Sequence, residues 1–338
     1  MTNHSTATDQ SALKDGFGRT IDYLRLSVTD RCDFRCVYCM SEDVRFLPRA
    51  QVLTLEELAT LGQAFTELGI KRIRLTGGEP LVRRDIVSLV SRISALPGLD
   101  EVTLTTNGSQ LTQFAKPLQQ AGLRRLNISL DTLQQERFSS LTRRDKLDQV
   151  LAGIDAAVDA GFERIKLNAV ILKGRNDDEI VPLVDYARER KIDISFIEEM
   201  PLGEIVEHDR AATYCSSDEV QKIISEKYPL AASTEATGGP SRYFRMADSR
   251  SRIGLISPHS HNFCDACNRI RITVEGQLLL CLGRENAIDL RAILRRYPGD
   301  TEPLKHAVLD ALQYKPERHH FDVEDEPQIV RFMNMTGG

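Results

Sequence analysis

The chain has 338 residues, 28% of them charged and 41% hydrophobic, and a formal net charge of −5. This length suits one large α/β domain with a smaller appendage. The acidic balance argues against a nucleic-acid partner, and no apolar run approaches the roughly 20 residues of a membrane span. Residues 1–19 form a polar lead-in without the apolar centre of a secretory signal, so we expect a cytoplasmic protein.

Short β-branched runs alternate with amphipathic helical patterns up to about residue 200, which predicts repeated βα units and a parallel sheet. The expected strands are 22–28, 71–76, 101–106, 124–130, 164–172 and 193–199. Expected helices include 54–68, where Thr54 and Glu57 have capping-box spacing, 146–160 and 177–190. A doubly wound sheet also fits this order. Because no nucleotide-binding glycine fingerprint follows the first strand, an incomplete (βα)6 TIM-like barrel is favoured.

The pattern changes after Pro201. Residues 252–258 and 269–282 predict antiparallel strands, with a hairpin turn at Glu275 and Gly276. We therefore divide the chain into three parts: the lead-in 1–19, a partial barrel 20–230, and a C-terminal α+β region 231–338 that closes the barrel mouth.

Six of the seven cysteines fall into two groups of three, and Cys215 stands alone as an incidental residue. In a cytoplasmic chain such groups indicate metal or redox chemistry rather than disulfides. The first group, Cys32, Cys36 and Cys39, has CxxxCxxC spacing. A closed zinc site takes four ligands, whereas a [4Fe-4S] cluster held by three cysteines keeps one iron open for an outside ligand.

Three free buried cysteines are the alternative for this loop. The charged residues Arg31, Asp33 and Arg35 alternate with the thiols and argue against it. The second group is Cys264, Cys267 and Cys281, and His259 or His261 could complete a Cys3His zinc site there. Spacing alone leaves zinc and an iron–sulfur cluster equally open for this group.

The motif 76-TGGEP-80 follows the second predicted strand, as CVYC follows the first. Together they resemble the radical S-adenosylmethionine (SAM) superfamily, whose CxxxCxxC loop and GGE motif occupy these places. Over about residues 20–338 the chain is similar to the GTP 3',8-cyclase family of molybdenum cofactor biosynthesis. The motifs that carry this likeness are RLSVTDRCDFRCVYC, TTNG, ISLD, KLNAV, EEMP, NRIRIT beside the second CxxC, and a terminal Gly-Gly.

The resemblance implies two [4Fe-4S] clusters, one on each cysteine group. SAM would bind the open iron of the first cluster and, on reduction, release a 5'-deoxyadenosyl radical. The second cluster would face the guanine base of GTP. SAM contacts carried over from the family are Tyr38, Gly78, Glu79, Ser129 and Met200.

The implied substrate is GTP, converted to 3',8-cyclo-7,8-dihydroguanosine triphosphate by removal of H3' and formation of a C3'–C8 bond. Its expected contacts are Arg25, Arg74, Thr105, Lys166, Arg269, Ile270 and Arg271, and Arg72 shares a strand face with Arg74 as a further candidate. Arg269 and Arg271 are also expected to act in catalysis, together with the terminal Gly337 and Gly338.

Two other readings remain open: a peptide-modifying radical SAM enzyme with two clusters, and a non-catalytic zinc- or iron-binding interaction protein. NRIRIT and the terminal glycines favour the cyclase. The resemblance further implies an electron donor that the sequence does not name and a downstream enzyme of molybdopterin synthesis. No nucleic-acid or membrane partner is expected, and a homodimer is left open.

Overall fold

The computed structural model describes residues 12–203, 205, 208–319, 321 and 329–337. A twelve-stranded sheet runs through it in the order β12-β11-β10-β1-β2-β3-β4-β5-β6-β9-β8-β7. The six expected strands lie side by side and parallel at its centre. They are β1 (Tyr23–Ser27), β2 (Arg72–Thr76), β3 (Glu101–Thr106), β4 (Arg125–Ser129), β5 (Arg164–Val170) and β6 (Asp193–Ile197).

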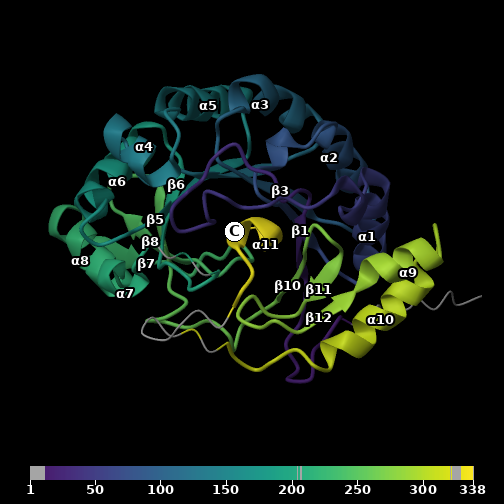
Figure 1. The fold of residues 1–338 in the computed structure, drawn as a ribbon. Helices are drawn as coiled ribbons and strands as arrows, with labels where there is room; N and C mark the ends of the chain where they lie inside the picture. The colour runs from purple at the N-terminus through teal and green to yellow at the C-terminus, as the bar shows by residue number, and fades with distance from the viewer. Residues whose placement is uncertain (1–11, 204, 206–207, 320, 322–328, 338) are drawn as a thin grey trace, which may run out of the picture.

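Helices cover the outer face of these strands in an arc, which Figure 1 shows around a hollow centre. They are α1 (Leu55–Glu67), α2 (Ile86–Ser94), α3 (Leu111–Gln120), α4 (Gln135–Thr142), α5 (Leu147–Ala160) and α6 (Ile180–Glu189). Short 3-10 turns lie at Arg49–Gln51, Pro80–Val82 and Asp177–Glu179. The expected capping box at Thr54 and Glu57 begins α1. The prediction of an incomplete TIM-like barrel is confirmed.

The later part of the chain extends both edges of this parallel array. On one side β9 (Arg252–Ile256) pairs parallel with β6 and continues into β8 (Arg242–Met246) and β7 (Leu230–Ala232). On the other side β10 (Arg269–Ile272) pairs parallel with β1 and continues into β11 (Gln277–Leu279) and β12 (Ala287–Asp289). The boundary drawn near residue 230 thus falls where β7 enters this same sheet.

The remaining helices are α7 (Arg210–Thr213), α8 (Ser217–Lys227), α9 (Leu290–Arg296), α10 (Glu302–Leu312) and α11 (Met333–Thr336). The short α11 lies at the hollow centre of the arc in Figure 1. The expected turn at Glu275 and Gly276 joins β10 to β11, with Gly276 at φ +82°. Within the lead-in, Leu13 is buried and its carbonyl accepts a hydrogen bond from the Ile21 amide, so residues 12–19 pack against the domain. No helix in the described ranges is long and apolar enough to cross a membrane.

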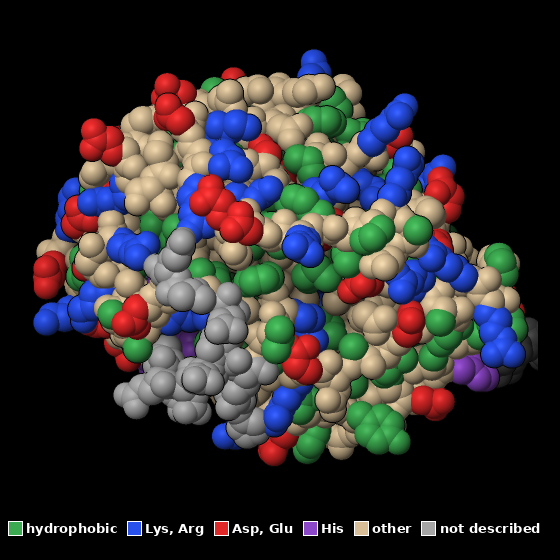
Figure 2. Space-filling view, in the orientation of Figure 1, with side chains coloured by type: hydrophobic (Ala, Val, Ile, Leu, Met, Phe, Trp, Pro, Cys, Tyr) green, Lys and Arg blue, Asp and Glu red, His purple; other side chains and the backbone are tan. Residues whose placement is uncertain are grey.

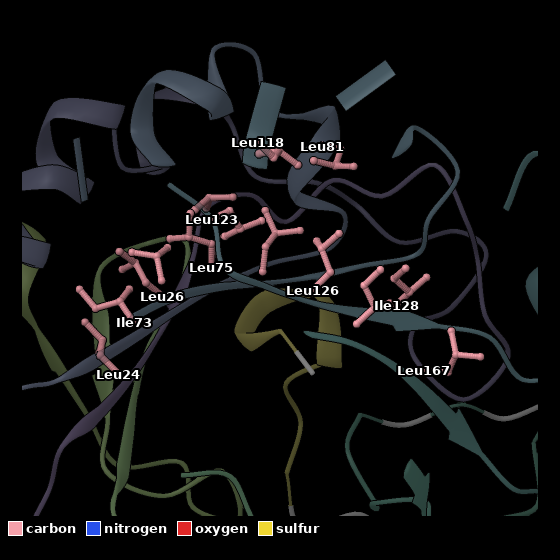
Figure 3. Packing of buried hydrophobic residues seen from close by; sticks show 14 of the residues in the cluster. Leu24, Leu26, Ile73, Leu75, Leu81, Leu118, Leu123, Leu126, Ile128 and Leu167 are labelled. Carbon is pink, nitrogen blue, oxygen red and sulfur yellow. The ribbon is translucent and has the colours of Figure 1, made fainter. Parts of the chain in front are cut away.

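The alternation of side chains along the strands decides what the barrel contains. Figure 3 shows strand residues such as Leu26, Leu75 and Ile128 on the side of the strands that faces the helices, and all three are fully buried. Since neighbouring side chains point to opposite faces, Arg25 and Arg74 face the interior. An apolar outer layer therefore encloses a polar interior.

A buried ion pair joins the starts of β6 and β9. The Arg252 guanidinium donates to the Asp193 carboxylate, whose other oxygen accepts the Arg252 amide at 3.0 Å. The Arg252 side chain is 3% exposed and the Asp193 side chain 12%. Removal of either partner would leave the other charge buried.

We expect Asp193→Asn to lower the free energy of unfolding by about 3 kcal/mol, because it leaves the buried Arg252 guanidinium with only the more exposed Glu235 carboxylate as a counter-charge. Asp248→Asn is the matched control, because this carboxylate pairs with Arg188 in solvent; it should cost less than about 1 kcal/mol. Denaturant unfolding of both variants measures the difference, and equal losses would contradict this interpretation.

Candidate active site

One cavity of about 250 Å³ opens in the barrel interior. Its walls include both cysteine groups: Cys32, Cys36 and Cys39 on one part, and Cys264, Cys267 and Cys281 on another. Arginines, a lysine and the β2–α2 glycine turn also line it. The two sites expected from the sequence therefore share one chamber.

The first cysteine loop leaves the end of β1 and is held by two other segments, the end of α4 and the loop after β3. The amides of Arg35 and Val37 donate to the carbonyls of Thr142 and Leu141, each at 2.9 Å, at the end of α4. The Asp33 carboxylate accepts hydrogen bonds from Asn107 Nδ2 (2.7 Å) and from the Ser109 hydroxyl (2.8 Å). The loop is therefore fixed before any ligand binds.

The protonation of these thiols depends on their surroundings. Burial raises the pKa of Cys32 and of Cys36, and it raises the pKa of Cys39 to about 12, although the Asn334 amide donates to the Cys39 sulfur and opposes the shift. Metal centres bind thiolates. Assembly of a cluster here must therefore release protons from the three cysteines.

The glycine turn after β2 lies directly on this loop. A Cβ atom on Gly78 would stand 2.3 Å from the Arg31 carbonyl oxygen, and one on Gly77 would stand 2.4 Å from that of Thr29. Only glycine allows this approach. It brings the Gly78 backbone to the cavity wall beside the cysteines.

The Glu79 side chain does not lie where a contact with SAM would require it. Its carboxylate accepts hydrogen bonds from the amides of Asn107 (2.6 Å) and Leu81 (2.9 Å) and from the Thr106 hydroxyl (2.8 Å). Burial nevertheless raises its pKa to about 7. The side chain braces the loop after β3 and is not on the cavity wall, so the structure provides no support for the expected contact with the SAM ammonium group.

The other expected SAM contacts, Tyr38, Ser129 and Met200, do line the cavity. The Tyr38 hydroxyl donates to Asp131 at 2.6 Å, and Asp131 also accepts the Val170 amide at 2.8 Å. Burial raises the pKa of Asp131 to about 6, although both hydrogen bonds oppose the shift. The sequence analysis missed Asp131, although it lies in the ISLD motif.

Five buried cations gather in the interior: Arg25, Arg74, Lys166, Arg269 and Arg271. Arg25 on β1 pairs in register with Arg74 on one side and with Arg271 on the other. Within the described residues none of the five forms an ion pair with a carboxylate. Among the residues that the structure describes, Arg25 Nε, Arg269 Nη1 and Thr105 Oγ1 have no hydrogen-bond partner. The charge and the free polar atoms of the chamber therefore suit an anionic ligand with further hydrogen-bonding groups.

The charges of these cations affect one another. Burial, then Arg271 and Arg74, holds the pKa of Arg25 well below its usual range. Burial, then Arg269 and Arg74, lowers the pKa of Arg271 to about 9. Ile270 also lines the cavity. Arg72 does not join the group: it pairs with Asp22 at 2.6 Å and is not on the wall, so that expectation is wrong.

The second cysteine group flanks a hairpin: Cys264 and Cys267 precede β10, and Cys281 follows β11. Burial raises the pKa of the Cys267 thiol, but Lys315 and Arg269 outweigh it and lower that pKa to about 7. His259 Nε2 lies 2.8 Å from the Glu199 carbonyl oxygen and His261 Nε2 lies 2.7 Å from Asp218. Neither expected zinc ligand lines the cavity, whereas His319, which the sequence analysis missed, does.

In the described part of the chain, no three His, Cys, Asp or Glu side chains are placed to hold a single metal ion; a [4Fe-4S] cluster is held differently, with each cysteine on a separate iron.

The C-terminal segment enters the barrel beside these groups. Arg271 Nη1 donates to the Gly337 carbonyl at 2.6 Å, and the Thr76 hydroxyl donates to the Thr336 carbonyl at 3.3 Å. Gly337 has φ +71°, and a Cβ atom there would lie 2.2 Å from the Thr76 side chain. The expected partner Gly338 lies outside the described residues.

Charges of both signs are mixed on the face of the molecule drawn in Figure 2, the same face that Figure 1 presents. This mixture agrees with a net charge of −5. The concentration of unpaired positive charge is a property of the interior.

The family models divide the chain between α6 and β6. Residues 26–187 match the radical SAM superfamily and residues 192–321 match Molybdenum Cofactor Synthesis C. Curated relatives cover nearly the whole chain. A protein of Pseudomonas putida (strain W619) called GTP 3',8-cyclase is 63% identical over 97% of this chain and 98% of its own length.

The chain belongs to the GTP 3',8-cyclase family.

Relatives with this family name also occur in two other organisms. That of Ectopseudomonas mendocina is 61% identical over 96% of this chain and 98% of its own length. That of Marinobacter nauticus is 60% identical over 97% of this chain and 99% of its own length. Membership in the radical SAM superfamily implies a [4Fe-4S] cluster and SAM. Among solved structures, Streptococcus suis SuiB bound to S-adenosylmethionine is 17% identical, with a TM-score of 0.56 over 93% of this chain and 77% of SuiB. At that identity the likeness shows the fold alone.

We expect Gly78→Ala to weaken iron retention at the first cysteine group of this cyclase-family protein by about tenfold, because the added methyl group displaces the Arg31 carbonyl and with it the cysteine loop. Gly239→Ala is the matched control, because the nearest atom to its Cβ would be 3.9 Å away. Iron analysis in chains lacking the second cysteine group measures the effect. Equal iron in both variants would contradict the close approach.

Proposed function

We propose that this protein converts GTP to 3',8-cyclo-7,8-dihydroguanosine triphosphate, the first step of molybdenum cofactor biosynthesis. The carrying observation is the set of five buried cations that have no carboxylate partner among the described residues, in one chamber with two cysteine triplets. A triphosphate brings about as much negative charge as this set needs, and guanidinium groups match phosphate oxygens in a two-pronged geometry. A peptide substrate offers no such charge.

Each group of residues then has a physical task. Arg25, Arg74, Lys166, Arg269 and Arg271 would bind the triphosphate. Thr105, whose hydroxyl has no partner, would hydrogen-bond the ribose region. Tyr38, Gly78, Ser129 and Met200 would orient SAM beside the first cysteine loop, with Asp131 holding the Tyr38 hydroxyl.

The residues present fit the implied groups. Three thiols from one rigid loop face a chamber with room for a further ligand, as a cluster with an open iron requires. When bound and reduced, this cluster and SAM would supply the deoxyadenosyl radical that removes H3'. We propose a second [4Fe-4S] cluster on Cys264, Cys267 and Cys281, supported by membership in the GTP 3',8-cyclase family; the two histidines expected as zinc ligands, His259 and His261, are engaged elsewhere.

The tail would act as a positioning element. Gly337 presents its carbonyl to Arg271, which orients that guanidinium and fills space that solvent would otherwise occupy. Water must be kept from a radical intermediate. We propose that Gly337 and the following Gly338 assist productive radical formation in this way.

The reaction needs a one-electron donor and delivers its product to a later enzyme of the same biosynthesis, and we propose both as partners in the cytoplasm. A homodimer stays a prediction.

Anaerobic incubation of the reduced protein with SAM and GTP tests the proposal. We expect 5'-deoxyadenosine and a cyclised nucleotide, both dependent on GTP, from protein containing about two clusters' worth of iron and sulfide. Zinc without sulfide would support the interaction protein instead, and deoxyadenosine released only with a peptide would support the peptide-modifying alternative.

We expect Gly337→Val to reduce turnover about a hundredfold while both clusters are retained, because the side chain would overlap Thr76 and move the carbonyl away from Arg271. Val330→Ser, at a position 76% exposed in the same tail, is the control and should leave turnover unchanged. Steady-state rates alongside iron content measure the effect. Wild-type turnover by the Gly337→Val variant would contradict the proposed role of Gly337.

GTP affinity should fall as the pH rises through about 9. Because the pKa of Arg271 in the free protein is lowered to about 9, and bound phosphate favours its charged form, GTP binding above that pH must take up a proton. Calorimetry in buffers of different ionisation enthalpy should show more proton uptake at about pH 9.5 than at about pH 8. Equal uptake at both values would contradict the assignment of Arg271.

A further inference from the structure

Two further cations, the buried Lys315 and the half-buried Arg19, contact the segments around the second cysteine group without lining the cavity. Lys315 follows α10 and is 2% exposed. Its Nζ donates to the carbonyl of Arg269 at 3.1 Å and to that of Leu280. Leu280 directly precedes Cys281, and Arg269 lies two residues after Cys267. One ammonium group therefore ties together the two ends of the hairpin that these cysteines flank.

Arg19 performs the same task for the third cysteine. Its Nη1 donates to the carbonyls of Cys264 (2.9 Å) and Glu317 (2.8 Å), and its Nη2 donates to that of Pro316 (2.7 Å). Its Nε pairs with the buried carboxylate of Asp15 at 2.6 Å. The N-terminal segment thereby fixes the Cys264 loop to the segment that contains Lys315.

The charges of the two cations are balanced differently. The positive charge of Arg19 is offset by the Asp15 carboxylate. In the described ranges, Lys315 pairs with no carboxylate, and its ammonium group donates only to carbonyl oxygens. A buried ammonium group without a counter-charge costs several kcal/mol. Lys315 interacts electrostatically with Cys267, and three thiolates on one cluster carry a net negative charge. Occupation of the second cysteine group would therefore offset the cost of burying Lys315.

We propose that Lys315 and Arg19 are positioning residues for the second cluster: they hold its three cysteines in register, and Lys315 balances its charge. This inference rests on the proposed cluster at Cys264, Cys267 and Cys281. It gives a role to residues 12–19, which the sequence analysis treated as a lead-in, and to the segment after α10.

The test uses full-length protein in which Cys32, Cys36 and Cys39 are replaced by alanine, so that only the second group can bind iron. Lys315→Met should speed iron loss to a chelator about tenfold or more and shift the midpoint potential of the remaining cluster to more negative values, because a nearby positive charge favours the added electron. Lys315→Arg should restore the potential. Arg19→Gln should speed iron loss without so large a shift, because Asp15 already offsets its charge.

Arg318→Met is the matched control. Arg318 lies on the same segment and pairs with Asp265, but its side chain is 58% exposed. Iron retention and potential should stay at the parent values. Equal behaviour of the Lys315→Met and Arg318→Met variants would overturn the inference, whereas a parent chain that binds no iron at all would overturn the second cluster and the inference together.

A folding defect is separated by a second background, in which Cys264, Cys267 and Cys281 are replaced by alanine. There Lys315 has no thiolate to balance, so Lys315→Met should leave the melting temperature unchanged or raise it, and the iron of the first group should stay. If Lys315→Met lowered the melting temperature equally in both backgrounds, the role of Lys315 would be purely structural. That result would overturn the proposal.

Discussion

Unpaired positive charge inside the barrel is the constraint on which the rest of the site depends. Arg25, Arg74 and Arg271 lie on three adjacent parallel strands, in register, with their side chains buried. Their mutual repulsion and burial lower the pKa of Arg25 and of Arg271. The apolar layer between strands and helices, seen in Figure 3, must stabilise the fold against this cost. A bound anion would reduce this cost, because its negative charge offsets the repulsion between the arginines.

The chamber around these charges is assembled from segments far apart in the chain. The Met333 amide donates to the Cys39 carbonyl at 3.2 Å, and Asn334 Nδ2 donates to the Asp30 carbonyl at 2.9 Å. The end of the chain therefore rests on the first cysteine loop. Through Arg19, the N-terminal part of the described chain in turn contacts the second cysteine group. Neither cysteine group depends on its own loop alone for its geometry.

Much of the fold could be predicted from the sequence, because it is encoded locally. The six parallel strands begin and end within three residues of their expected bounds, since β-branched runs and turn residues mark them. Helix α1 was predictable from its capping box. The parallel pairing of β9 with β6 and of β10 with β1 was not, because it depends on contacts between residues far apart in sequence.

The site divides in the same way. The cysteines and the cations of the interior could be predicted from spacing and resemblance, and the structure brings them into one cavity. Arg72 was mispredicted because strand periodicity gives the face of a residue but not its partner, here Asp22. Asp131, His319 and Lys315 were missed, since a single polar residue carries no spacing signal and its role depends on what folds against it.

The binding of GTP compared with guanosine, measured by calorimetry on the chain without SAM, tests this account most directly. If the interior cations receive the triphosphate, GTP should bind at least about a hundredfold more tightly than guanosine, as several charge-assisted hydrogen bonds require. Arg25→Gln should narrow that difference. Equal affinity for GTP and guanosine would contradict the central claim that the buried positive charge of the barrel exists to hold a triphosphate.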